Sequence, residues 1–394
     1  MKPSNRSKNP PELASEQYNL TELLLDRLRQ RRSAKWTAWP PDVLPAFVAE
    51  MDFPLARPVK DALARAIELD DTGYANPDGS GLAAAFTGFA RRRFNWQVDP
   101  GQIKATTDVV GGLRALLDLV AAPREGVVIN PPVYFPFFSI IPEAGRELVE
   151  VPLREEGRLD LEAIGRAFEQ GARAMILCSP HNPVGTVPSR AELERLAELA
   201  VAHDAWVLAD EIHAPLTLPG ATHVPFLEVS DAARECGICV TSASKTFNIA
   251  GLVCAVVVTG GERAAELVSK LPAGATHPGH LGVIASQAAF EAGDKWLDQV
   301  VSQLDLNRQL LADLLNRYLP TARYRAPEAG YLAWIDATDL GLGPDPATEI
   351  FDRARVAVSS GPGFGQGGAG HFRLNIGTSP NLIEAAVRSI AEIT

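Results

Sequence analysis

Three side chains with complementary chemistry each follow a hydrophobic stretch of the sequence. Asn182 comes shortly after residues 174–178, Asp210 directly after 205–209, and Lys245 after the apolar run 238–240. If these stretches are parallel strands, their carboxyl ends meet at one edge of the sheet, and the three side chains lie together. A carboxylate can keep a pyridine nitrogen protonated, an amide can bond a phenolic oxygen, and a lysine can form a Schiff base. The three residues therefore predict a site for a pyridine-type cofactor.

Lys245 lies among small hydroxyl residues, with Ser242 and Ser244 just before it. Burial between two strands would disfavour the ammonium form, lower the pKa of Lys245 and make its amine a nucleophile. The serine hydroxyls could bond an anion such as a phosphate. The competing interpretation of this S-x-S-K stretch is a connecting loop with an exposed lysine.

A second anion site is expected where a short strand, residues 103–106, runs into a helix. Backbone N–H groups at the start of that helix, at Val109 and Val110, would attract an anion together with the helix dipole. The nearby glycine pair does not match G-x-G-x-x-G, which makes a dinucleotide site a weak alternative.

Two tyrosines and one arginine are further candidates. Tyr134 follows the apolar stretch 127–129, where it could stack on a flat ring or simply pack in the core. Tyr74, in a turn-rich loop over residues 73–81, could pack or offer its hydroxyl to a ligand. Arg373 alternates with two apolar neighbours and could hold an α-carboxylate through two parallel hydrogen bonds, the alternative being a surface salt bridge.

Composition limits the classes of function. The chain has 394 residues, 46% of them hydrophobic, and a formal net charge of −11, which argues against nucleic acid and anionic membranes as partners. Four cysteines form no disulfide framework, and the lone C-x-x-C at Cys236–Cys239 is too weak to predict a metal site. Without a membrane-length apolar run or a signal-peptide core, a cytoplasmic protein is expected.

The order of the segments predicts an α/β protein. Strand-like and helix-like stretches alternate from residue 103 onward, which indicates a mainly parallel sheet with helices on both faces. Before them we expect a helix beginning at Thr21 and ending before Trp36, then an extended segment, residues 44–54, whose two acids could line a site, cap a helix or be solvated in a loop. The glycine-rich stretch 361–370 is expected to form a mobile or tight loop.

These motifs together resemble the pyridoxal-phosphate enzymes of the class I/II aminotransferase family. The order N-P-x-G, D-E and S-x-S-K is similar to that family, and the chain is most similar to its MalY/PatB-type cystathionine β-lyases, or C–S lyases. The segments that carry this resemblance are 49–53, 180–185, 210–214, 244–251 and 296–298. His213 and Val253 stand where many aminotransferases have a tyrosine and a phosphate-binding arginine, which also resembles the lyase branch.

The resemblance implies an architecture. It implies fold type I, in which a large domain with a mainly parallel seven-stranded sheet flanked by helices is joined to a smaller α+β domain. The implied division is a flexible tail over residues 1–17, an arm and part of the small domain over 18–55, the large cofactor domain over 56–294, and the small C-terminal domain over 295–394.

The resemblance also implies a role for each candidate residue. Lys245 would carry pyridoxal 5′-phosphate, and Tyr74 and Tyr134 are the other catalytic candidates. The implied cofactor-binding residues are Lys245, Asp210, Asn182, His213, Tyr134, Val109, Val110, Ser242, Ser244 and Tyr74, the last of these reaching the site of a neighbouring subunit in a homodimer. The implied substrate-binding residues are Arg373, Asn182 and Ala49.

The implied reaction is β-elimination on a small sulfur amino acid. L-Cystathionine, and also cystine or other S-substituted cysteines, would give a thiol, pyruvate and ammonia, placing the enzyme in sulfur amino acid metabolism such as methionine biosynthesis. An aminotransferase on the same scaffold is the nearest alternative. A regulatory protein that keeps the fold in order to bind a partner is a second one.

Overall fold

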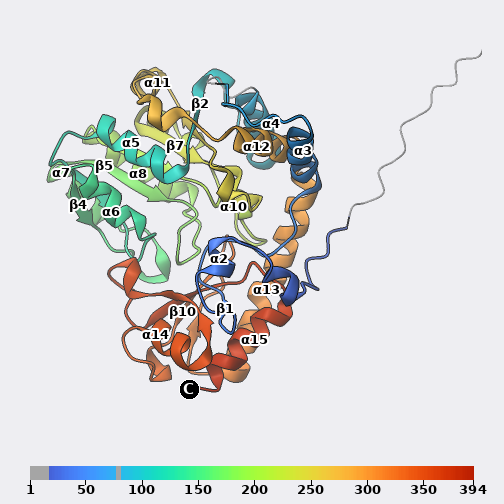
Figure 1. Cartoon of the computed structure of the whole chain (residues 1–394). Helices are drawn as coiled ribbons and strands as arrows, with labels where there is room; N and C mark the ends of the chain where they lie inside the picture. Colours follow the sequence, from blue (N-terminus) through green and yellow to red (C-terminus); the bar gives the residue numbers. More distant parts are fainter. Residues whose placement is uncertain (1–16, 77–80) are drawn as a thin grey trace, which may run out of the picture.

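The computed structural model describes residues 17–76 and 81–394, and it contains two main sheets (Figure 1). All of the expected tail except Gln17, and residues 77–80 of the expected turn-rich loop, lie outside the described residues. The larger sheet and its helices fill the upper part of the view in Figure 1, and the C-terminal part of the chain fills the lower part.

The larger sheet has seven strands in the order β2-β8-β7-β6-β5-β3-β4. Neighbouring strands from β7 to β4 are parallel, whereas β8 runs antiparallel to both β7 and β2. The strands are β2 (Ile103–Thr106), β3 (Gly126–Ile129), β4 (Glu147–Glu150), β5 (Ala172–Cys178), β6 (Trp206–Asp210), β7 (Gly237–Thr241) and β8 (Ala255–Thr259). The predicted mainly parallel sheet of seven strands is confirmed.

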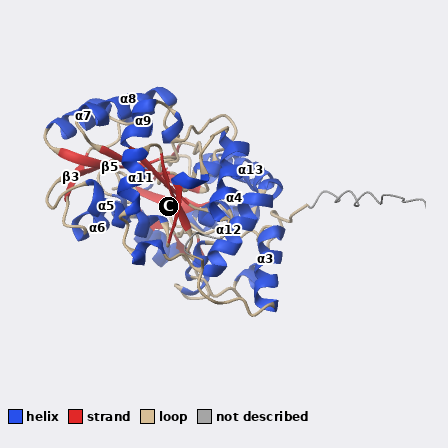
Figure 2. Ribbon diagram, turned by 90° about the horizontal axis from the view of Figure 1, so that it is seen from above, coloured by secondary structure: helices blue, strands red, loops and turns tan. Residues whose placement is uncertain are grey.

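The central strands are apolar throughout because both faces of the sheet are covered. Within β5, Met175 and Leu177 point into one hydrophobic core, and Ala174 and Ile176 point into the other. The first core includes residues of α7 (Leu161–Glu169), α8 (Arg190–Ala202) and α9 (Asp231–Cys236), and the second those of α5 (Val109–Val120), α6 (Pro136–Glu143) and α11 (Glu262–Ser269). Figure 2 shows α7 and α8 on one side of the strands and α5 and α6 on the other.

A four-stranded antiparallel sheet, in the order β12-β13-β10-β9, forms the C-terminal part. Its strands are β9 (Arg323–Tyr324), β10 (Leu332–Asp336), β12 (Ser359–Ser360) and β13 (His371–Asn375). The N-terminal segment joins this part, because β1 (Leu44–Pro45) pairs in parallel with β11 (Val356–Ala357). This association fits the expected arm, and the proposed domain boundaries themselves stay a prediction.

Helices connect and cover the two sheets. The longest, α13 (Asp294–Tyr318), runs from the large sheet to the C-terminal part, where it packs on α15 (Pro380–Ala391) (Figure 1). The remaining α-helices are α1 (Leu25–Leu28), α2 (Ala34–Thr37), α3 (Arg57–Glu68), α4 (Leu82–Phe94), α10 (Ala243–Thr246), α12 (His280–Ala292) and α14 (Pro346–Glu349). No helix in the described part of the chain is long and apolar enough to cross a membrane.

The prediction of one helix from Thr21 to just before Trp36 is wrong. Only two short helical turns form there, α1 and α2, and Trp36 lies inside the second. Tertiary contacts override the helical pattern, since Arg31 donates to the Asp52 carbonyl oxygen at 2.7 Å and Trp36 Nε1 donates to the Asp52 carboxylate at 3.1 Å. The break between the two turns lets these side chains meet residues 50–52.

Close packing of α12 against the loop after Lys245 gives a stability prediction. A methyl group on Gly282 would overlap the Leu252 carbonyl oxygen and lie 2.9 Å from Cys254 Cβ. Gly282→Ala should therefore lower the free energy of unfolding by about 1–3 kcal/mol, as overpacking does. The control is Gly88→Ala in α4, where a methyl group meets only the end of the Arg92 side chain. Denaturant titration of both variants should show a lower free energy of unfolding for Gly282→Ala alone.

Candidate active site

Three neighbouring parallel strands carry the central polar residues to one edge of the large sheet. Asp210 is the last residue of β6, where it pairs with Cys178 of β5 and Val240 of β7. Asn182 lies in the loop after β5, and Lys245 lies in α10, directly after β7. All three line the same cavity, as their positions at strand ends predicted.

This cavity has a volume of about 200 Å³ and collects most of the expected residues. Those present are Ala49, Val109, Val110, Tyr134, Asn182, Asp210, His213, Lys245 and Arg373. Sequence reasoning missed the other lining residues, which are Phe47, Val48, Phe135, Cys178, Ile212 and Ser359. Phe135, Cys178 and Ile212 lie close in sequence to predicted site residues. Ser359 lies in β12, and no sequence motif marks it.

The charges of Asp210 and Lys245 are both opposed by burial. Burial raises the pKa of the Asp210 carboxyl to about 7, although Ile212 N donates to it at 3.2 Å. Burial also lowers the pKa of the Lys245 amine, with Arg373 adding to the effect and Glu50 and Asp210 opposing it. Lys245 Nζ donates to the Ala49 carbonyl oxygen at 3.0 Å. Burial therefore favours the neutral amine of Lys245 more than water would, and a nearby cation would stabilise the ionised Asp210 carboxylate.

Arg373 and Asn182 are tied to each other across the two sheets. Arg373 Nη1 donates to Asn182 Oδ1 at 2.9 Å, which leaves the Asn182 amide N–H groups free to turn toward a ligand. Arg373 Nη2 donates to the Phe47 carbonyl oxygen and to Ser359 Oγ, both at 3.1 Å. The guanidinium lies 4.9 Å from the centre of the Phe364 ring, which supports it by a cation–π contact.

Two further lining residues keep their neutral forms at physiological pH. Burial lowers the pKa of His213 to about 3, helped by Lys245 and Arg373, and its Nδ1 atom has no hydrogen-bond partner among the described residues. Burial, and next the charge of Asp210, raises the pKa of Tyr134 to about 12. Both side chains can therefore donate or accept a hydrogen bond without bringing charge into the cavity.

One wall of the cavity is an irregular segment, residues 46–52, here called the strap. Its backbone is held by side chains from elsewhere in the chain. Asn375 Nδ2 donates to the Val48 and Glu50 carbonyl oxygens, both at 2.7 Å. Asn248, three residues after Lys245, accepts from Met51 N at 2.8 Å and donates to Met51 O at 2.7 Å. These bonds fix Ala49 where its carbonyl meets Lys245.

The two acids of the strap anchor it and do not line the cavity. Asp52 forms a buried ion pair with Lys35, with 2.9 Å between the carboxylate and Nζ, and both side chains are almost fully buried. Ser33 Oγ donates to the Glu50 carboxylate at 2.5 Å. Neither acid lines the cavity, and the expected alternatives of helix capping or loop solvation do not describe them either, because their carboxylates bond to α2 and to the residue before it.

Three expected site residues lie outside the cavity wall. Ser242 Oγ donates to the Cys254 carbonyl oxygen at 2.6 Å and accepts from Ser244 N at 3.0 Å, as the N-cap of α10. Neither serine lines the cavity. Tyr74 is 99% exposed in this single chain and borders a separate surface pocket with residues 73–76 and 276–280. Their roles toward a phosphate stay predictions.

A family model describes this architecture. The model named "Aminotransferase class I and II" matches residues 50–390, which is most of the chain. The chain belongs to this family. It is 42% identical to a putative cystathionine β-lyase of Mycobacterium leprae over 94% of this chain and 96% of that protein. It is also 32% identical to cystathionine β-lyase PatB of Bacillus subtilis over 89% and 92% of the two chains.

A solved structure agrees with the sequence comparison. The putative PLP-dependent β-cystathionase of Corynebacterium diphtheriae superimposes with a TM-score of 0.90 at 35% identity, over 95% of this chain and 98% of that one. The resemblance to MalY/PatB-type lyases and the fold type I architecture are both confirmed. The match to the family model includes the cavity residues from Val109 to Arg373.

The raised pKa of Asp210 gives a pH-dependent prediction for protein dialysed free of small molecules. The folded value is about 7 and the ordinary value 3.8, so the unfolded chain ionises first and this residue lowers the free energy of unfolding as pH rises from about 4 to about 7. Asp210→Asn removes that penalty. Relative to the wild type, the free energy of unfolding of the variant should rise across this pH range by on the order of a few kcal/mol, and the difference should stay constant above pH 7.

Asp160→Asn is the matched control, because hydrogen bonds from Ala163 N and Arg154 lower the pKa of Asp160. Its ionised form stabilises the fold, so that variant should instead lose stability relative to the wild type as pH rises through about 4. Urea titrations at several pH values measure both differences. An Asp210→Asn curve parallel to the wild type at every pH would contradict the assignment.

Proposed function

We propose that the protein is a pyridoxal 5′-phosphate-dependent C–S β-lyase that cleaves L-cystathionine by β-elimination. The observation that carries this proposal is the cavity that brings Lys245, Asp210, Asn182 and Arg373 together, in a chain that shares 42% identity with a protein named as a cystathionine β-lyase. Cystine and other S-substituted cysteines are further substrates under the same chemistry.

The residues of the cavity fit pyridoxal 5′-phosphate. Buried Asp210 has a carboxyl that a protonated ring nitrogen would stabilise as the carboxylate. The Asn182 amide, whose oxygen is taken by Arg373, has N–H groups left for the ring oxygen. Tyr134 supplies an aromatic face, and Val109 and Val110 lie at the N-terminus of α5, where backbone N–H groups favour a phosphate. When bound, the cofactor supplies an electron sink for the carbanion at Cα.

The reaction steps fall to named side chains. Arg373 would hold the substrate α-carboxylate through its guanidinium, with Asn182 and the strap at Ala49 completing the subsite. Lys245, once free, would take the Cα proton, and burial assists this step because it lowers the pKa of the amine. The Cβ–S bond then breaks and releases the thiol, homocysteine in the case of cystathionine, and the remaining fragment hydrolyses to pyruvate and ammonia.

Two departures from ordinary aminotransferases support elimination. His213, in the position where many aminotransferases have a tyrosine, is a neutral side chain in the cavity wall, and Val253, in the position of a phosphate-binding arginine, is 43% exposed and bears no charge. Transamination remains the alternative because the family is described as aminotransferases. Measuring the thiol and keto-acid products separates the two reactions.

The test follows pyruvate and free thiol together after purified holoenzyme is mixed with L-cystathionine. The two products should appear in equal amounts. Lys245→Ala should lose at least about 1,000-fold in kcat because it removes both the covalent attachment and the base. Lys270→Ala, which removes an exposed lysine paired with Glu266, is the control and should match the wild type.

Other outcomes decide against the lyase. Amino transfer that depends on added keto acid, without thiol, would establish an aminotransferase. A protein that binds the cofactor, transforms no amino acid and captures a protein partner would support the regulatory alternative. If the cofactor does not bind at all, the whole assignment fails.

We further propose a homodimer in the cytoplasm, with Tyr74 of each chain completing the partner's site. Exposed apolar side chains support an interface, since Ile67 and Leu69, which precede Tyr74 in the sequence by seven and five residues, are 58% and 57% exposed. Light scattering should then give twice the chain mass.

Mixing two inactive variants tests the shared site. A hybrid dimer of Lys245→Ala and Tyr74→Ala chains has one intact site, so an equal mixture, dissociated and reassembled at random, should recover about a quarter of wild-type activity. No recovery from a mixture shown to contain hybrids would contradict the proposal that Tyr74 acts across the interface.

A further inference from the structure

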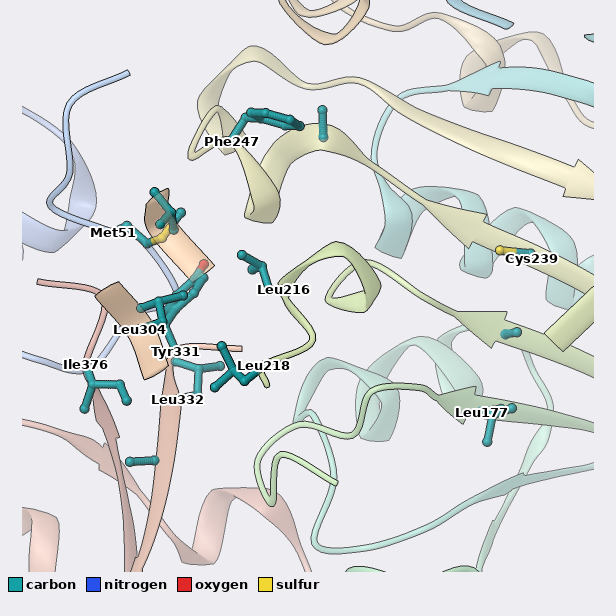
Figure 3. Close-up of a cluster of buried hydrophobic side chains, with 14 of the residues drawn as sticks. Met51, Leu177, Leu216, Leu218, Cys239, Phe247, Leu304, Tyr331, Leu332 and Ile376 are labelled. Atoms are coloured by element: carbon teal, nitrogen blue, oxygen red, sulfur yellow. The ribbon is translucent and has the colours of Figure 1, made fainter. Parts of the chain in front are cut away.

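Tyr331 is a fully buried tyrosine whose hydroxyl reaches the strap. It directly precedes β10, and its ring lies in the hydrophobic cluster with Met51, Leu304 and Leu332 (Figure 3). Its hydroxyl donates to the Ala49 carbonyl oxygen at 3.0 Å. The same oxygen accepts from Lys245 Nζ, also at 3.0 Å. One carbonyl oxygen, with two lone pairs, thus receives both donors.

The Ala49 carbonyl differs from its neighbours in the strap. Val48 O accepts from Glu50 N and from Asn375, and Glu50 O accepts from Lys35 and from Asn375. Among the described residues, Ala49 O has Tyr331 as its donor besides Lys245. Asn375 and Asn248 hold the backbone on either side of Ala49, and the Tyr331 hydroxyl is the group that bonds directly to the oxygen that meets the lysine amine.

We propose that Tyr331 is a positioning residue for Lys245. The Tyr331 hydroxyl orients the Ala49 carbonyl and uses part of the capacity of that oxygen to accept hydrogen bonds. The oxygen therefore holds the lysine amine in place without holding it as an ammonium ion. The inference rests on the proposed cofactor site and adds a residue to it. Tyr331 is absent from the cavity wall, so it acts through Ala49.

The sign of the effect follows from hydrogen bonding to the charged form. Without the hydroxyl, the Ala49 oxygen is left to Lys245 alone and becomes a stronger acceptor for the ammonium, which favours the charged form of the amine. Only the neutral amine adds to the cofactor aldehyde, whose oxygen then leaves as water while a carbon–nitrogen double bond forms. Covalent capture should therefore become slower at neutral pH and recover as pH rises.

Other charged and titratable groups act on Lys245 from several elements, and the substitution Tyr331→Phe leaves them all in place. They are Arg373 on β13, Glu50 in the strap, Asp210 at the end of β6 and His213 after β6. Each should contribute to the pH profile of the wild type and of the variant alike. The difference between the two profiles therefore isolates the hydroxyl.

The experiment adds pyridoxal 5′-phosphate to cofactor-free protein and follows the visible band of the lysine-bound cofactor between pH 6 and pH 9. Tyr331→Phe should react about 3- to 10-fold more slowly than the wild type at pH 7. Its rate profile should be displaced to higher pH, so that the two rates approach each other above pH 7. The matched control is Tyr324→Phe, because Tyr324 is a tyrosine of the same sheet whose hydroxyl donates to the Arg308 carbonyl oxygen at 3.4 Å, away from the cavity. It should follow the wild type.

Three results would overturn the inference. The first is a Tyr331→Phe profile that coincides with the wild type. The second is a uniform slowing at every pH that Tyr324→Phe shares, since that would show a general packing defect. The third is a wild type that forms no lysine-bound band at any pH, which would contradict the proposed cofactor site as well as the role of Tyr331. A normal wild-type band beside an unshifted variant contradicts the role of Tyr331 alone and leaves the lyase proposal standing.

Discussion

The site depends on burying an irregular backbone segment without leaving its polar groups unbonded. Residues 46–52 follow β1 and form no strand of their own, and each buried carbonyl left without a donor would cost about 1–3 kcal/mol. Side chains supply the missing donors, above all Asn375 from β13 and Asn248 from the loop after Lys245. The strap therefore joins the N-terminal arm, the C-terminal sheet and the lysine loop into one wall, and a change in any of the three reaches the others.

Burial also sets the electrostatic character of the cavity. Taking Asp210 and Lys245 out of water moves their pKa values in opposite directions, toward a protonated acid and a neutral amine. Pyridoxal 5′-phosphate would suit both groups, because Asp210 could pair with its ring nitrogen and Lys245 could bond its aldehyde carbon. Arg373 also lines the cavity, where Asn182, Ser359 and the strap hold its guanidinium, and burial lowers its pKa only to about 10, which leaves it charged at neutral pH.

The sequence allowed the central residues to be predicted wherever local pattern determines position. Asn182, Asp210 and Lys245 follow apolar strands, and parallel strands bring their ends together by necessity. Ser359 and Tyr331 could not be found in this way, because their contacts with the strap arise only from packing between segments about 300 residues apart. The mistaken helix from Thr21 has the same origin, since ion pairing and hydrogen bonding to Asp52 outweigh a modest helical propensity. Ser242 caps α10 and Tyr74 is exposed in the single chain, so their proposed roles toward a phosphate stay predictions.

The central claim is that the fold prepares one lysine for covalent attachment of the cofactor. Protein loaded with pyridoxal 5′-phosphate can be reduced with borohydride, digested, and searched by mass spectrometry for the pyridoxyl mass. The structure predicts one modification per chain, at Lys245, because this amine is buried beside Asp210 and Arg373. Label spread over exposed lysines such as Lys270, with Lys245 unmodified, would contradict the claim and with it the proposed function.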